Sequence, residues 1–394
     1  MISTQNKYIQ SKYIQSWIHS PVVDLVFIIS PAFLITLIVI LFRNSFDHTE
    51  ALPLWAWIVF IVLVDVAHVY SSVFRTYFNP LEFKQNATLF TLIPFFAWLI
   101  SVILYSLNDL LFWRVLAYIA VFHFVRQQYG FMALYSRKQP DEYKPFKLLD
   151  AALIYIATIY PIIFWHTHLP RNFNWFVEDD FLVGLPVLVE RICLILYLLI
   201  SVCYIVKEVY LSIKTKYFNI PKNLILLGTG LSWYVGIVLL NGDMAFTAIN
   251  VVSHGIPYMA LLWIYGRGIS QQSDPLISEQ AILQFRFPKL NLSYKFLFSI
   301  ICIPVFLVFL WSFAYLEESL WDSLVWRENP TLFQAFYSLP LLKSKQFLAI
   351  IVPLLSLPQL THYILDAFIW RLKPLNDKAN NNWVNTLFYT SNNQ

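Results

Sequence analysis

The sequence predicts an all-α fold, a polytopic integral membrane bundle. Hydrophobic residues make up 58% of the 394 residues and charged residues only 13%, and the mean hydropathy is +0.60. Apolar runs of about 20 residues recur along the whole chain, and a helix of that length spans the hydrocarbon core of a bilayer. A transmembrane β-barrel would instead show alternating segments of about ten residues.

About ten apolar stretches have this length. We place them at 22–42, 52–74, 88–107, 112–136, 148–168, 186–208, 222–241, 243–266, 294–316 and 346–370. No linker divides the chain, so residues 1–394 are expected to form one transmembrane domain with a polar N-terminal segment at 1–21. The loop at 268–293 is expected in the cytoplasm. The loop at 317–345 is expected on the outer side, where its apolar part could form an interfacial helix.

The distribution of positive charge predicts the orientation. If the N-terminus is cytoplasmic, most of the 27 Lys and Arg residues fall in cytoplasmic segments, as the positive-inside rule requires. Both termini are then cytoplasmic, and the chain is expected to be a multi-pass protein of a cell inner membrane. The formal charge of +4 is scattered, so no nucleic-acid partner is expected. Cys193, Cys203 and Cys302 form no Cys-x-x-Cys pair and are expected to pack as small apolar residues.

Four of the eight histidines lie inside predicted spans: His68, His123, His254 and His362. They fall on the second, fourth, eighth and tenth spans, which all cross the membrane in the same direction. Each lies in or near the cytoplasmic half of its span, and a rise of 1.5 Å per residue puts the four depths within about 10 Å of one another. Four imidazoles at similar depth on four helices could meet at one point.

Two aspartates accompany these histidines on the same helix faces. Asp65 comes three residues before His68, and Asp366 comes four residues after His362. Ionisable groups inside a membrane are costly and mark functional sites. Neutral imidazole is a common metal ligand, and a carboxylate often holds its second ring nitrogen. We therefore expect a metal site formed by the four histidines, with the two aspartates as ligands or as groups that orient them.

The type of ligand atom limits which metals the site could bind. Histidine-rich sites without sulfur suit Fe(II), Cu or Zn, and iron is our expectation because it would activate O₂ against an apolar lipid or isoprenoid substrate in the bilayer. Arg126, Gln127 and Tyr129 closely follow His123 and are expected to shape the substrate pocket. The fork of Arg126 could bind a carboxylate or phosphate.

Many spans with one four-histidine centre resemble the Brp/Blh family of membrane carotenoid dioxygenases. The residues that carry this resemblance are His68, His123, His254 and His362. In that family, histidines from several spans hold a single iron that cleaves β-carotene to retinal, so the resemblance implies a mononuclear iron site. The segments "HFVRQQYG" and "THYILDAFIW" also resemble parts of bacterial multi-span proteins.

Other interpretations of the same residues remain open. The membrane di-iron desaturases are not among them, because those enzymes carry eight or more histidines in His-x(3–4)-His and His-x-x-His-His boxes, which this chain lacks. The four histidines could instead ligate haem, form a proton relay in a transporter, or include one catalytic base of a transferase. Singly, each could join helices by a hydrogen bond. The aspartates could pair with Arg75 or Arg126. His166 and His168 are expected to be interfacial.

Overall fold

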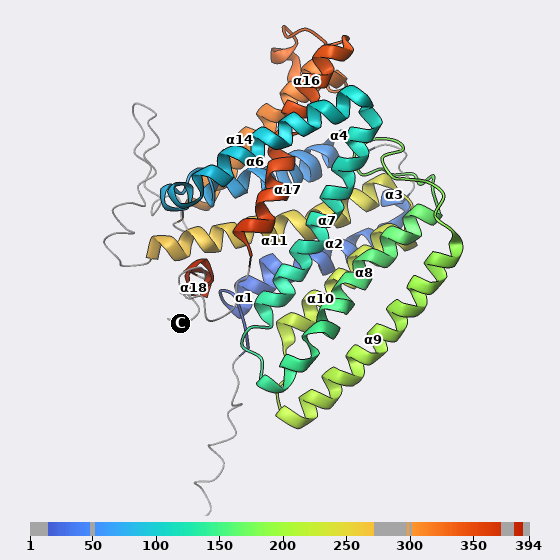
Figure 1. The fold of residues 1–394 in the computed structure, drawn as a ribbon, viewed down its shortest axis with the longest axis vertical. Coiled ribbons are helices and arrows are strands. Elements are labelled where there is room, and N and C mark those ends of the chain that lie inside the picture. Colours follow the sequence, from blue (N-terminus) through green and yellow to red (C-terminus); the bar gives the residue numbers. More distant parts are fainter. Residues whose placement is uncertain (1–14, 48–51, 272–297, 299–301, 372–381, 389–394) are drawn as a thin grey trace, which may run out of the picture.

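A computed structural model describes residues 15–47, 52–271, 298, 302–371 and 382–388. Within these ranges the chain is helical and contains no strand, which confirms the predicted all-α class (Figure 1). Most of the expected segment 1–21 and of the expected loop 268–293 lies outside the described residues, as does the start of the expected span 294–316.

The first half of the described chain forms α1 (Pro21–Val23), η1 (Asp24–Ile29), α2 (Ser30–Leu41), α3 (Arg43–Phe46), α4 (Leu54–Ala56), η2 (Trp57–Val66), α5 (Ala67–Ser71), η3 (Ser72–Phe74), α6 (Pro80–Leu107), α7 (Asp109–Tyr135), η4 (Asp141–Phe146) and α8 (Lys147–Thr167). The second half forms α9 (Val187–Thr215), α10 (Ile220–Trp233), η5 (Tyr234–Leu239), α11 (Asp243–Gln271), α14 (Ile303–Trp321), η7 (Asp322–Trp326), α15 (Pro330–Phe333), η8 (Gln334–Phe336), α16 (Lys345–Leu355), α17 (Leu357–Ile369) and α18 (Asn382–Phe388). The labels η1, η2, η5 and η7 are π-helical stretches that continue neighbouring α-helices.

The helices have the length and apolar character of a multi-pass membrane protein. Eight helical segments of the described chain are long and apolar enough to cross a bilayer. The predicted span 112–136 corresponds to α7, which is not among these eight. The pair α16 and α17 adds a ninth if its two halves count as one span, bent by 43°. Pro358 stands in the first turn of α17, where a missing backbone N–H is tolerated after a break. The predicted last span, 346–370, is therefore a broken helix.

The central helix of the bundle is α11. Of the membrane-length segments it is the most deeply buried, with 83% of its apolar window inside the protein, whereas the corresponding share of α9 is 22%. Figure 1 shows α9 at the edge of the bundle and α11 crossing its middle. α11 packs on α5, α5 on α17, and α17 on α7. These four helices carry the four membrane histidines.

The helix boundaries place one acidic residue differently from the sequence prediction. The expected outer loop began at residue 317, but α14 continues to Trp321, so Glu317 lies inside a helix and is buried. The rest of that loop contains the π-helical stretch η7 and the short helices α15 and η8.

A buried charge network joins α8, α9 and α10. Lys207 contacts Asp150 and donates to Glu208 at 2.5 Å. Lys222 donates to the same oxygen of Glu208 at 2.5 Å and lies 3.5 Å from Asp150. Two cations and two carboxylates balance each other, which makes their burial tolerable and ties the three helices together.

Candidate metal centre

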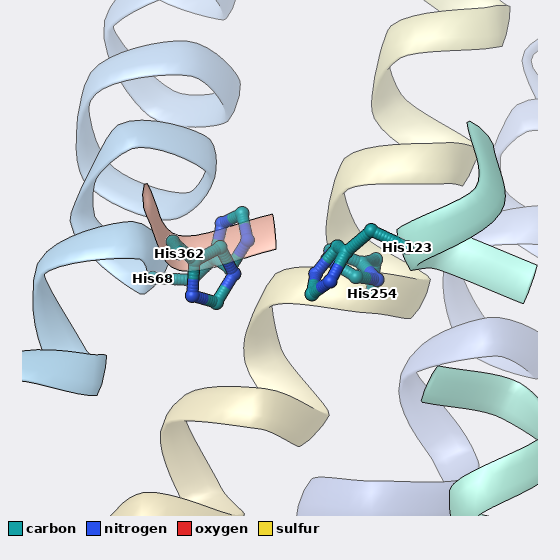
Figure 2. Close-up of side chains that lie close together, drawn as sticks. All are labelled: His68, His123, His254 and His362. Carbon is teal, nitrogen blue, oxygen red and sulfur yellow. The ribbon is translucent and has the colours of Figure 1, made fainter. Parts of the chain in front are cut away.

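The structure brings His68, His123, His254 and His362 together. One ring nitrogen from each lies within 4.8 Å of the others, so the predicted convergence of the four side chains is confirmed. Figure 2 shows them entering from four helices: α5 in blue, α7 in teal, α11 in yellow and α17 in red. All four are buried, with at most 4% of each residue exposed.

The four rings contact each other in a closed cycle. The centroid of His68 lies 4.8 Å from that of His254, which lies 5.0 Å from His123. His123 lies 4.6 Å from His362, and His362 lies 5.1 Å from His68. Neighbouring planes are inclined by 65° to 89°. The four imidazoles therefore surround one small volume.

The ring nitrogens lack hydrogen-bond partners. Both nitrogens of His68, His254 and His362, and Nε2 of His123, are buried without one among the described residues. Each unsatisfied buried polar group costs about 1–3 kcal/mol. One metal ion would satisfy a nitrogen of every ring. Metal–nitrogen bonds of about 2.1 Å allow two ligand nitrogens to lie at most about 4.2 Å apart, so separations of up to 4.8 Å require a small inward shift before the four nitrogens can hold one ion.

A glycine allows the close packing that places two of these rings side by side. A Cβ on Gly255 would lie 2.8 Å from Cγ1 of Val64 and 3.5 Å from Cβ of His68. Only a residue without a side chain lets α11 approach η2 and α5 this closely. The π-helical η2 ends directly before α5, and such stretches are frequent at functional sites.

Aromatic neighbours fix the planes of two rings. The ring of Phe124 stacks on His254 at 3.6 Å between centroids, with an angle of 7° between planes. Tyr363 lies 4.9 Å from His123 at an angle of 33°. These contacts restrict rotation of the imidazoles, as a preorganised ligand set requires.

Both predicted aspartates lie beside the cluster. Asp65 Oδ1 is 3.6 Å from Nδ1 of His68. Asp366 is 3.7 Å from Nδ1 of His362 and, through its other oxygen, 3.8 Å from Nδ1 of His123. The described metal-ligand group contains only the histidines. The contacts of Asp366 with two rings suit a carboxylate that orients ligands from outside the metal shell.

Within the described chain, neither aspartate forms an ion pair with an arginine, so the alternative Asp–Arg pairing is not seen. Arg75 instead lies over the rings of Trp370, Tyr265 and Trp383 at 3.9, 4.4 and 5.0 Å. It also donates a hydrogen bond of 2.5 Å to the carbonyl oxygen of Ile369.

A cavity of about 290 Å³ reaches the cluster and is lined by His123 and Asp366. Arg126, Gln127 and Tyr129, the residues predicted to shape a substrate pocket, all line this cavity. Gln127 Nε2 donates to the carbonyl oxygen of His254 at 2.9 Å, which joins the pocket wall to the histidine cluster.

The three other described histidines have separate surroundings. His19 is buried, and its backbone N–H donates to Asp24 Oδ1 at 3.0 Å. His166 has Tyr118 Oη and the carbonyl oxygen of Ile162 as partners, each at 2.7 Å. His168 contacts the carbonyl oxygen of Phe164 at 2.9 Å. None of the three joins the histidine cluster. His48 lies outside the described residues.

Two groups near the site were not predicted. Tyr258 donates to Asp366 at 2.6 Å, and its position four residues after His254 could have revealed it, because the two share a helix face. Glu317 accepts from Tyr70 at 2.6 Å and from the amide of Gln359. Its sequence position gave no signal, since it adjoins other acidic residues at the end of a span.

The donor set fits a metal ion on geometry, burial and unsatisfied nitrogen atoms. Comparisons with protein-family models, curated proteins and solved structures found no match to this chain.

Proposed function

We propose that the protein is a membrane-embedded, non-haem iron oxygenase that acts on an apolar lipid or isoprenoid substrate. The observation that supports this most strongly is the cluster of four buried histidines with unpartnered ring nitrogens. Buried imidazoles without partners are unfavourable unless something compensates them, and a transition metal does so with all four at once.

The residues of the site would have different roles in this function. His68, His123, His254 and His362 hold the ion, and Asp366 orients His123 and His362. The cavity beside His123 would bring an apolar substrate to the centre. Bound iron would supply O₂ activation there. The balanced reaction that needs no reductant is dioxygenation, in which a C=C bond and O₂ give two C=O groups.

Haem is a weaker candidate on geometry. Axial ligation of haem requires a flat macrocycle between two opposed imidazoles. Here each ring has two other imidazoles at centroid distances of 4.6–5.1 Å. A macrocycle between any two rings would collide with the remaining pair. Copper and zinc fit the same donors as iron, and metal analysis distinguishes the three.

A proton-coupled transporter is the second candidate. The observation that favours it is the buried Glu317, which hydrogen-bonds Tyr70 and Gln359, because buried carboxylates in membrane helices often relay protons. A transporter of this kind would need no tightly bound metal.

The proposed setting is a bacterial inner membrane, with ten spans and both termini in the cytoplasm. The bias of Lys and Arg toward one set of loops supports the orientation. Reporter fusions at the two termini test it: cytoplasmic reporter activity is expected at both ends, and periplasmic activity at either end would overturn this topology.

Elemental analysis and absorption spectra of detergent-purified protein test the function. Wild type is compared with His362→Ala and with the control His168→Ala, whose histidine is outside the centre. About one iron per chain without a Soret band is expected, lost only in His362→Ala. Wild-type protein that binds no metal after supplementation with iron, copper and zinc would favour the transporter, and a Soret band would favour haem.

A further inference from the structure

The cavity beside the four histidines has positively charged residues in its wall, which an apolar substrate alone does not explain. Arg126 and Arg371 both line it. Arg126 is exposed although it lies in the middle of α7, nine residues before the end of that helix. A rise of 1.5 Å per residue puts it about 14 Å from the helix end. Within the predicted span 112–136, a guanidinium at that depth is costly unless an anion or water compensates it.

Arg126 has no carboxylate partner among the described residues. Its Nη1 donates to the hydroxyl of Tyr155 at 2.6 Å, and its guanidinium lies 5.0 Å from the ring centroid of Tyr129. The described carboxylate in the cavity wall is Asp366, which contacts Tyr258 and two histidines. The positive charge of Arg126 is therefore available to a ligand.

The cavity also reaches the outer surface of the helix bundle. Phe122 on α7 lines it and is 57% exposed. Ala367 on α17 lines it and is exposed as well. Because α7 and α17 pack against each other, these exposed residues indicate an opening of the cavity between the two helices. A ligand can thus enter through this opening.

We infer that the cavity binds an amphiphile with an anionic head, a carboxylate or a phosphate, which Arg126 holds. The planar fork of arginine matches both groups in a bidentate manner. The aromatic and aliphatic wall, which includes Phe131, Leu134 and Leu261, receives the apolar chain.

The spacing of two residues on α7 orients this ligand. His123 and Arg126 are three residues apart and line the same cavity, so their Cα atoms are separated by about 4.5 Å along the helix axis. A head held at Arg126 presents the carbon atoms nearest the head to the histidine cluster. The substrate class is therefore an anionic lipid or isoprenoid with its reactive double bond close to the head. This assignment of the substrate rests on the proposed oxygenase function.

Equilibrium binding to detergent-purified protein tests the inference with three probes of equal chain length. Farnesyl phosphate and farnesoic acid carry anionic heads, and farnesol is neutral. At least one anionic probe is expected to bind about ten- to hundredfold more tightly than farnesol, the size of a charge-assisted hydrogen-bond contribution. The better anion identifies the head. Equal binding of all three probes would overturn the inference.

The variants separate the arginine from the metal. Arg126→Gln is expected to lower anion binding to the farnesol level with iron content unchanged, and Arg126→Lys is expected to retain part of it. Arg114→Gln is the matched control, because it removes the same charge from the same helix outside the cavity. Unchanged anion binding in Arg126→Gln would overturn the inference. Wild-type protein without metal that still binds the anion through Arg126 would refute the oxygenase while leaving this binding site standing.

Discussion

The hydroxyl of Tyr258 donates a 2.6 Å hydrogen bond to Oδ1 of Asp366. This bond joins α11 to α17 beside the histidine cluster. It holds the carboxylate where it lies 3.7 and 3.8 Å from Nδ1 of His362 and His123. A group that is held in place and contacts two ligand rings at once is well suited to orienting them.

The first prediction is that replacing the carboxylate of Asp366 weakens metal binding. Asp366→Asn is expected to weaken metal binding by about 10–100-fold, because the partner that orients two imidazoles loses its charge. Tyr258→Phe is expected to have a smaller effect in the same direction. Metal retention against increasing chelator measures both. The control Asp179→Asn changes an exposed carboxyl in a loop and is expected to match wild type, and equal metal retention in Asp366→Asn would show that the carboxylate has no such role.

The second prediction concerns the close packing at Gly255. Gly255→Ala places a methyl group 2.8 Å from Val64 Cγ1 and is expected to cost about 1–3 kcal/mol through overpacking. It should also reduce metal content, because α11 shifts away from α5. The double variant Gly255→Ala with Val64→Ala is expected to recover both properties.

Gly130→Ala is the matched control for this packing effect. A Cβ at Gly130 meets no atom within 4 Å, so the helix is expected to keep or gain up to about 1 kcal/mol of stability. Thermal unfolding in detergent compares the variants. If Gly255→Ala unfolds at the wild-type temperature with full metal content, the tight approach of α11 does not position His254.

The third prediction is that the buried charge network stabilises the fold without affecting metal binding. Lys222→Met leaves Asp150 and Glu208 with Lys207 as the remaining cation of the network, and one uncompensated buried charge costs about 3–5 kcal/mol. The unfolding temperature should fall while the metal content of the folded fraction stays at the wild-type level. Lys214→Met, an exposed lysine on α9, should leave both unchanged. Metal loss in Lys222→Met at temperatures where the protein is folded would contradict this separation.

The fourth prediction is that the metal stabilises the fold. Free metal at 100 times its dissociation constant adds about 2.7 kcal/mol to a native state that binds one ion. A chelator is therefore expected to lower the unfolding temperature of wild type, and added iron to restore it. His254→Ala should show no response to either treatment. A wild-type protein insensitive to chelator, with its iron demonstrably removed, would argue against coupling between metal and fold.

The sequence was informative wherever a property repeats along one helix. Apolar runs predicted most of the membrane-length helices, and the depths expected for His68, His123, His254 and His362 predicted the convergence of these side chains. Helical spacing also placed Asp65 within 3.6 Å of His68. These relationships depend on position along a helix and on the order of the helices, both of which can be predicted from one chain.

Contacts between distant segments could not be predicted in this way. The bond of Tyr258 to Asp366 joins residues 108 positions apart, and that of Tyr70 to Glu317 joins residues 247 apart. The rotation of each helix about its axis decides such pairs, and an apolar run fixes that rotation poorly. For the same reason, the sequence could not predict that Asp366 contacts His123 as well as its own neighbour His362.

X-ray absorption at the iron edge of the purified, iron-loaded protein tests the central claim most directly. The account predicts nitrogen neighbours at about 2.1 Å, with the multiple-scattering pattern of four imidazoles in wild type and of three in His362→Ala. An iron environment without imidazole scattering, or one identical in wild type and His362→Ala, would contradict the assignment of these four histidines as a metal centre.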